Sequence, residues 1–340
     1  MLDDLKYIHG RDKSDALGVA AKQWQQLQQE YEVDISSVEI KNVVLAGMGG
    51  SALAATFIST WPKLNLPFEI ARSYDIPNYV GEGTLFIASS YSGNTEETLS
   101  ALEKAETAGA KIAVISAGGK LAEIARDKSY LFFELPGDFQ PRMAVFYNFA
   151  ALVQLLAGVG LIKNSVVSDL KSAADYLKTE SQSWNADVPA SQNLAKQIAL
   201  DVVGKSPVVY AGTLFPAAYK WKINFNENAK NVAWCNQLPE FNHNEFLGWS
   251  SHPTEKPYAP IFLQSSFDHS QVKKRFEVSG RLLSGKMPAP IKVEARGSNI
   301  LEQLLWVITL GDFVSLYTAL LNNLDPTPVD LIEKLKKELA

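Results

Sequence analysis

The first 160 residues alternate short β-branched apolar runs with longer helical segments, and this alternation restricts the fold more than any other feature of the sequence. The apolar runs predict strands at residues 42–46, 68–72, 85–89, 111–116 and 130–135. The other segments predict helices at 15–30, 51–61, 94–109 (with Asn94 as the N-cap), 121–127 and 144–159. Strands that alternate with helices form a parallel sheet covered on both faces. The pattern therefore predicts an α/β domain with a parallel five-stranded sheet.

The same alternation returns in the second half of the chain. Further strands are predicted at 207–212, 232–235, 261–264 and 291–294, and helices at 214–230, 271–283 and 299–321. A length of 340 residues exceeds one ordinary core. We therefore expect an N-terminal domain over 1–160, a helical connector over 161–190 and a C-terminal domain over 191–340, each domain with a parallel five-stranded sheet. Two similar halves commonly place a ligand site in the cleft between them.

Composition restricts the partners and the compartment. The net charge is −5, and no basic stripe is present to follow a phosphate backbone, so nucleic acid and membrane are not expected partners. The apolar stretch at 300–321 is interrupted by Glu302, Gln303 and Asp312, which predicts a buried core helix and not a membrane span. The N-terminus is polar, and the single Cys235 has no internal partner for a disulfide. A cytoplasmic protein is expected.

Two strand-to-helix loops have the composition of an anion site. In the first, which contains Gly49, Gly50 and Ser51, glycines let the backbone approach an anion at the start of a helix. The second, which contains Ser90, Ser92 and Thr95, adds three hydroxyls at the start of another helix. Hydroxyls together with backbone N–H groups suit a phosphate monoester. An ordinary turn and an anion site explain either loop alone equally well, and the two loops together favour a phosphate site.

A dinucleotide site is the competing interpretation of the first loop, because Gly47, Gly49 and Ala52 match Gly-x-Gly-x-x-Ala. Such a site needs an acidic residue at the end of the second strand, where this sequence has Arg72 and Ser73. Dinucleotide binding also gives no reason for the hydroxyls of the second loop. The phosphate interpretation is favoured.

The glycine loop at 49–51 and the run Ser-Tyr-Ser-Gly-Asn-Thr-Glu-Glu-Thr at 90–98 resemble the sugar isomerase (SIS) domain. Three phrases make the resemblance narrower: Pro-Arg at 141–142, Asn-Glu-Asn-Ala-Lys at 226–230, and Glu-x-Asn-His-Asn-Glu at 240–245. Together they resemble the bifunctional phosphoglucose/phosphomannose isomerases of the phosphoglucose isomerase superfamily. The resemblance implies two SIS-type domains in a homodimer that interconverts aldose and ketose 6-phosphates through an enediol.

Glu227 is the candidate base that moves the proton. Most glutamates are surface residues, but Asn224, Asn226 and Asn228 are mediocre helix formers that crowd the end of an otherwise good helix. Such a conflict between propensity and pattern is expected at a functional site. The resemblance assigns the same role to this glutamate.

His243 is the candidate for opening the sugar ring. Imidazole titrates near neutrality, and His243 lies in a stretch too polar for a core, unlike His9, His252 and His269, which we interpret as structural or solvated. The resemblance implies that this histidine reaches the active site of the neighbouring subunit.

Two cations complete the catalytic set that the resemblance implies. Arg142 follows the fifth predicted strand and would stabilise the enediolate, although a solvated arginine at a helix start is the simpler interpretation. Lys336 would help to open the ring, and Lys334 and Lys337 are close alternatives.

No metal and no cofactor are expected, because four scattered histidines and one cysteine form no zinc-type cluster. Two alternatives to the glucose and mannose phosphate isomerase remain. One is another SIS-type isomerase, acting on an amino sugar phosphate or arabinose phosphate. The other is a non-catalytic sugar-phosphate sensor, which would keep the serine loop without needing Glu227 or His243. Whether glucose and mannose phosphates are both used depends on cavity shape, which the sequence does not give.

Overall fold

The computed structural model describes residues 1–31 and 39–339 and divides the chain into two compact units. One unit comprises Lys22–Tyr176, and we call it the N-terminal unit. The other comprises Met1–Ala21 together with Leu177–Ala340, and we call it the C-terminal unit. The division falls inside helix α7 (Ser165–Glu180), which lies within the expected helical connector. The boundaries at 160 and 190 stay a prediction.

The N-terminal unit contains a five-stranded sheet in the order β2-β1-β3-β4-β5, with every pair parallel. Its strands are β1 (Asn42–Ala46), β2 (Phe68–Ala71), β3 (Thr84–Ser89), β4 (Lys111–Ser116) and β5 (Leu131–Glu134). The predicted parallel sheet is therefore confirmed. The β-branched and aromatic runs form these strands because both faces of a parallel sheet are buried.

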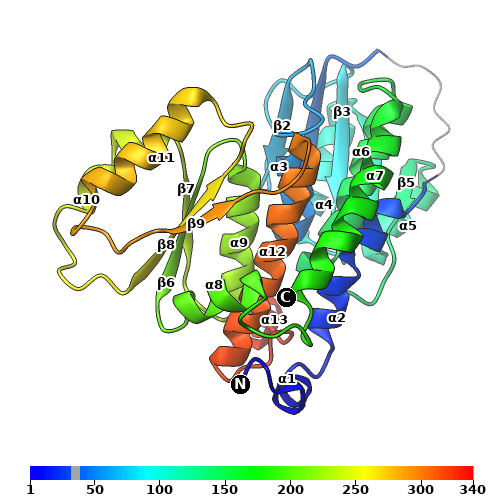
Figure 1. Cartoon of the computed structure of the whole chain (residues 1–340). Helices are drawn as coiled ribbons and strands as arrows, with labels where there is room; N and C mark the ends of the chain where they lie inside the picture. Colours follow the sequence, from blue (N-terminus) through cyan, green and yellow to red (C-terminus); the bar gives the residue numbers. More distant parts are fainter. Residues whose placement is uncertain (32–38, 340) are drawn as a thin grey trace. The chain divides into compact units, whose positions relative to one another are not determined.

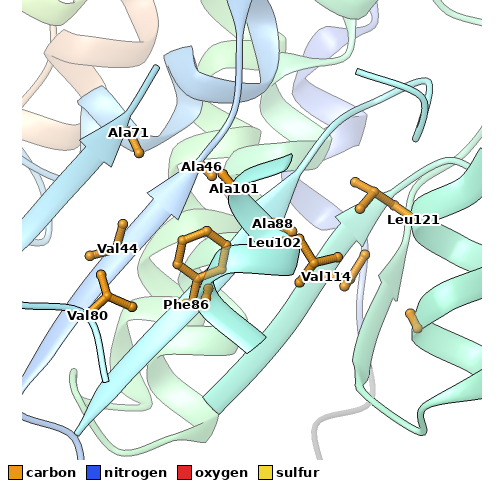
Figure 2. Close-up of a cluster of buried hydrophobic side chains, with 12 residues drawn as sticks. Val44, Ala46, Ala71, Val80, Phe86, Ala88, Ala101, Leu102, Val114 and Leu121 are labelled. Atoms are coloured by element: carbon orange, nitrogen blue, oxygen red, sulfur yellow. The ribbon is translucent and has the colours of Figure 1, made fainter. Parts of the chain in front are cut away.

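Apolar side chains on both faces of this sheet are covered by helices. Those helices are α3 (Gly49–Phe57), α4 (Glu96–Thr107), α5 (Gly119–Asp127) and α6 (Val145–Gly158). Figure 2 shows one cluster, in which Val44, Phe86 and Val114 of adjacent strands pack with Leu102 of α4 and Leu121 of α5. The alternate strand residues are equally buried, as the period of two requires.

The helix expected over 15–30 is divided in the structure. Its first part is α2 (Ala16–Ala21), and its second part is the 3₁₀ helix η1 (Gln23–Gln28). Gln26 of η1 is buried, and its side-chain amide donates to the Met143 carbonyl at 2.8 Å and accepts from the Tyr147 amide at 3.3 Å. Tertiary bonds of this kind hold the segment in a conformation that propensity alone does not predict.

The C-terminal unit contains a parallel sheet in the order β7-β6-β8-β9. Its strands are β6 (Ser206–Ala211), β7 (Trp234–Gln237), β8 (Tyr258–Gln264) and β9 (Ile291–Glu294). Four strands, and not the expected five, are present in the described residues. The reason lies in the sequence, since this half of the chain contains only four strand-like runs.

The remaining elements of the C-terminal unit are mostly helical. Besides α2, they are α1 (Leu5–Arg11), η3 (Ser181–Trp184), α8 (Leu194–Val202), α9 (Phe215–Glu227), η4 (Glu240–His243), α10 (Glu245–Gly248), α11 (Ser270–Leu282), α12 (Ile300–Leu321) and α13 (Asp330–Leu339).

Helix α12 forms the centre of this unit and packs against α8 and α9 (Figure 1). α12 is long and apolar enough to cross a membrane, but 94% of its most apolar 18-residue stretch is buried in the structure. Trp306 and Phe313 of α12 both contact Trp184 edge to face. The expected buried core helix is confirmed.

Candidate active site

The glycine and serine loops of the N-terminal unit lie at the point where its strand order reverses. The chain leaves β1 for β2 on one side and then enters β3 on the other side. Ligands of open parallel sheets bind at such a reversal, beyond the carboxyl ends of the strands. The two loops that follow β1 and β3 therefore occupy the favoured position for a ligand.

The glycine loop allows an unusually close approach between backbones. Gly49 has a φ of 49° and opens α3, and the side chain of the preceding Met48 forms no capping hydrogen bond. A Cβ on Gly50 would lie 2.7 Å from the Pro141 carbonyl oxygen and 3.3 Å from the Arg142 amide nitrogen. Glycine is therefore required for the 3₁₀ helix η2 (Pro141–Met143) to pack against the start of α3.

The serine loop contains a connected set of hydroxyls. Ser90 Oγ lies 2.7 Å from Thr95 Oγ1 and 3.5 Å from Ser92 Oγ. The Tyr91 amide donates to Ser51 Oγ at 3.0 Å, which joins this loop to the glycine loop. Ser92 is exposed and Thr95 is half-buried, so the hydroxyl set reaches the surface at the N-terminus of α4.

The expected capping role of Asn94 is wrong. The N-cap of α4 is Thr95, whose side chain makes no capping hydrogen bond. The side-chain oxygen Oδ1 of Asn94 instead accepts from the Lys120 amide at 3.0 Å, at the start of α5. Gly119 makes this possible, since a Cβ there would lie 2.8 Å from that same oxygen. Asn94 thus serves the neighbouring helix and leaves the start of α4 open.

Arg142 lies behind the glycine loop and is buried, with 2% of its surface exposed. This position contradicts the simpler interpretation of a solvated arginine at a helix start. The segment that leads to Arg142 is held by Tyr91, whose hydroxyl donates to the Pro136 carbonyl at 2.7 Å and accepts from the Phe139 amide at 3.0 Å. Burial raises the pKa of Tyr91, so its hydroxyl keeps its proton.

Glu227 is the last residue of α9 and is half-buried. The asparagines around it are used as anchors. Asn226 donates to the Asn231 carbonyl at 2.9 Å, and the buried Asn228 donates to Ser315 Oγ of α12 at 2.9 Å. The poor helix formers noted in the sequence therefore fix the end of α9.

His243 and Lys336 lie on two other elements of the C-terminal unit. His243 ends the short helix η4 and is exposed. Lys336 lies on the exposed helix α13, where its ammonium is 2.8 Å from the Glu333 carboxylate. Lys230, which follows Glu227 closely, donates to the carbonyls of Asp325 and Pro326 at 2.9 and 3.0 Å, just ahead of α13.

The structure thus gathers the candidate binding residues and Arg142 within the N-terminal unit, whereas Glu227, His243 and Lys336 belong to the C-terminal unit. The described residues contain no group of three or more His, Cys, Asp or Glu side chains that could hold a metal ion. Sequence reasoning missed the contribution of Gly93, whose φ is 70° and whose Cβ would lie 1.7 Å from the Gly118 carbonyl oxygen. The Gly118-Gly119 pair directly after β4 was the available signal.

Known proteins resemble both halves of the chain. The SIS domain model matches residues 38–133, and the model of the bacterial phospho-glucose isomerase C-terminal SIS domain matches residues 191–339. A glucose-6-phosphate isomerase-like protein from Thermus thermophilus has the same fold, with a TM-score of 0.68 at 20% identity over 99% of this chain and 98% of that one.

Two curated relatives cover almost the full length. A D-glucosamine-6-phosphate 4-epimerase from Sulfolobus acidocaldarius is 31% identical over 89% of this chain and 91% of its own. A bifunctional phosphoglucose/phosphomannose isomerase from Caldicellulosiruptor bescii is 36% identical over 93% of this chain and 96% of its own. Both SIS domain matches and this full-length similarity agree: the chain belongs to the family of bifunctional phosphoglucose/phosphomannose isomerases.

Proposed function

We propose that this isomerase interconverts glucose 6-phosphate and mannose 6-phosphate with fructose 6-phosphate through an enediol intermediate. The observation that carries the proposal is the linked pair of loops at the strand reversal, where the hydroxyls of Ser51, Ser90 and Thr95 gather beside two open helix starts. Such a site suits a phosphate monoester, which has three terminal oxygens to satisfy. The names of the relatives support the sugar to which that phosphate is attached.

Glu227 takes the proton from C2 of the open-chain aldose and returns it to C1, which converts the aldose to the ketose. The hydroxyl proton moves between the two oxygens in the same step, so the substrate and product are isomers. Glucose and mannose phosphates differ only at C2, which is planar in the enediol. Both sugars therefore pass through one intermediate.

The other residues act before and during this proton transfer. His243 and Lys336 exchange protons with the ring oxygen and the anomeric hydroxyl to open the sugar, with Lys334 and Lys337 as alternatives for the lysine. Arg142 supplies positive charge to the enediolate oxygens, and its burial makes that charge more effective than it would be in water. We place the enzyme in the cytoplasm, as the single Cys235 favours.

The direct test is a coupled assay that starts from fructose 6-phosphate and measures glucose 6-phosphate and mannose 6-phosphate separately. Formation of both products is the expected result. Binding of fructose 6-phosphate without turnover would favour the sugar-phosphate sensor, and inactivity on both hexose phosphates would contradict the proposal.

The epimerase from Sulfolobus acidocaldarius supports a second candidate reaction, at C4 of an amino sugar phosphate. Isotope exchange distinguishes the two. In deuterated water the isomerase labels C1 and C2 of the hexose phosphate, because the proton that Glu227 holds exchanges with solvent in part of the turnovers before it is returned to carbon. Conversion of glucosamine 6-phosphate to its C4 epimer, with no label entering hexose phosphates, would favour the epimerase instead.

The active enzyme is a homodimer in which His243 acts in the site of the partner subunit. The exposure of His243 on η4 supports this part of the proposal. Mixing two inactive variants, Glu227→Gln and His243→Ala, should restore part of the activity, because some mixed dimers then contain one complete site. Activity that stays absent after subunit exchange has been demonstrated would contradict a histidine that acts across the interface.

A further inference from the structure

A charged pair is buried where α9 and α12 pack together in the C-terminal unit. Lys220 and Asp312 are 1% and 4% exposed, and they form an ion pair. The helices approach closely because α12 has Gly311 at the contact, where a Cβ would lie 2.2 Å from Trp221 Nε1. Taking two charges out of water is costly, and a pair of apolar residues would fill the same space at lower cost. Stability alone is therefore a poor explanation for the pair.

Asn224 connects this pair to the end of α9. Lys220 Nζ donates to Asn224 Oδ1 at 2.9 Å, and the Asn224 amide donates to the Asp312 carboxylate. Asn224 is fully buried and lies one helical turn before Glu227, on the same helix.

A second connection runs through Ser315. Its hydroxyl donates to the Asp312 carbonyl at 2.8 Å and accepts from the Asn228 amide at 2.9 Å. Glu227 thus lies between two anchored positions, Asn224 and Asn228. Asp312 Oδ2 is buried and has no hydrogen-bond partner among the described residues, so the carboxylate depends on Lys220 for its charge balance.

We propose that the buried network of Lys220, Asn224, Asp312 and Ser315 positions the carboxylate of Glu227. The proposal rests on the proposed function, in which Glu227 is the base. Hydrogen bonds between buried polar groups fix one arrangement of the groups that they join, whereas apolar packing tolerates small shifts. Misplacing a base by about 1 Å costs on the order of 100-fold in rate. The network makes no contribution to phosphate binding.

The decisive variant replaces the charged pair with apolar residues of similar volume, Lys220→Met with Asp312→Leu. Removing the buried charges lowers the desolvation cost, but the buried side-chain amide of Asn224 loses its bonds to Lys220 and Asp312, so the melting temperature should fall modestly while the protein stays folded. We expect kcat to fall by about 10- to 100-fold, with KM for fructose 6-phosphate unchanged. A folded double variant with wild-type kcat would overturn the proposal, because the pair would then be structural only.

Lys196 provides a matched control, because it is another fully buried lysine of the same unit. Its ammonium donates to the carbonyls of Ala186 and Val188 at 2.8 and 2.7 Å and pairs with Asp3 at 3.2 Å. Lys196→Met should lower the melting temperature and leave kcat unchanged in the folded enzyme. An equal loss of kcat in this control would show that any buried lysine has the effect, and it would overturn the proposal.

Ser315→Ala keeps the test available if the double variant does not fold. It removes one hydroxyl, so the expected loss of kcat is smaller, severalfold, at constant KM. Wild-type kcat in this variant would overturn the proposal. Glu227→Gln, measured alongside, distinguishes a failure of the proposed function from a failure of the positioning proposal. If Glu227→Gln retains its rate, the proposed function fails. If Glu227→Gln loses its rate but the network variants retain theirs, only the positioning proposal fails.

Discussion

The two units have corresponding strand orders, β2-β1-β3 and β7-β6-β8, but they fill the space beyond the strand reversal differently. In the N-terminal unit this space is bordered by glycines and by the hydroxyls of the serine loop. In the C-terminal unit a carboxylate occupies it. Asp268 accepts from the Thr213 amide at 2.7 Å and from the Ser265 amide at 2.9 Å, and these amides follow β6 and β8.

The glycines that follow β1 and β6 differ in the same way, in the group that each one closely approaches. A Cβ on Gly47, after β1, would lie 2.8 Å from the Ser89 carbonyl oxygen, whereas a Cβ on Gly212, after β6, would lie 2.6 Å from Asp268 Oδ1. The C-terminal unit thus supplies an anion from its own chain, which leaves no place for a phosphate. We infer that the repeated fold keeps the anion site of the N-terminal unit open for substrate and closes the corresponding site of the C-terminal unit. We infer that the C-terminal unit supplies the groups for proton transfer.

The largest effect is expected from Glu227→Gln, which tests the division into a binding unit and a reacting unit. Without the base, kcat should fall by about 1000-fold or more, while KM for fructose 6-phosphate changes little because the anion site lies on the other unit. The coupled assay measures both quantities. Glu277→Gln, on the exposed surface of α11, is the matched control. A near-normal rate in Glu227→Gln would contradict the assignment of the base.

Asp268→Ala opens the second anion site and should destabilise the protein. The buried carboxylate satisfies two backbone amides, and hydrogen bonds to a charged group contribute about 1.5–3 kcal/mol each, so a loss of at least about 3 kcal/mol in the free energy of unfolding is expected. Denaturant titration measures this loss. Added phosphate should stabilise the variant more than the wild type, since it can replace the missing carboxylate. Equal stabilisation of the two proteins would show that the second site takes no anion even when it is open.

The smallest effect is expected from the double variant Ser90→Ala with Ser92→Ala, which weakens the open site. Two hydroxyls are lost from the phosphate ligands, so KM should rise by roughly 10- to 100-fold, with a smaller change in kcat. Ser100→Ala serves as the control, because its hydroxyl bonds the Tyr74 carbonyl and not the loop. A fall in kcat at constant KM would indicate that these serines act on the reaction and not on binding.

Local patterns predicted most of the strands and the two loops. β1, β4 and β9 have the predicted bounds, because β-branched runs bordered by turns specify a buried parallel strand. The identity of each hydrogen-bond partner was not predictable. Asn94 matches the sequence pattern of an N-cap residue, yet the Gly118-Gly119 pair places the start of α5 within hydrogen-bond distance of its side chain.

The buried polar network of the C-terminal unit could not be predicted from local sequence patterns either. The asparagines near Glu227 were noticed as a conflict, but their partners Asp312 and Ser315 lie almost 90 residues away along the chain. Contacts at that separation depend on tertiary packing and leave no periodic signal. For the same reason the role of Asp268 was visible only once β6 and β8 were placed side by side.

A crystal structure of Glu227→Gln with bound fructose 6-phosphate tests the division between binding and reacting units most directly. The phosphate should lie within hydrogen-bond distance of the Ser90, Ser92 and Thr95 hydroxyls, with C1 and C2 of the sugar facing residue 227 and with the Asp268 carboxylate still on its two amides. A phosphate beside Thr213 and Ser265, or a sugar whose C1 and C2 lie far from residue 227 in every subunit, would contradict it.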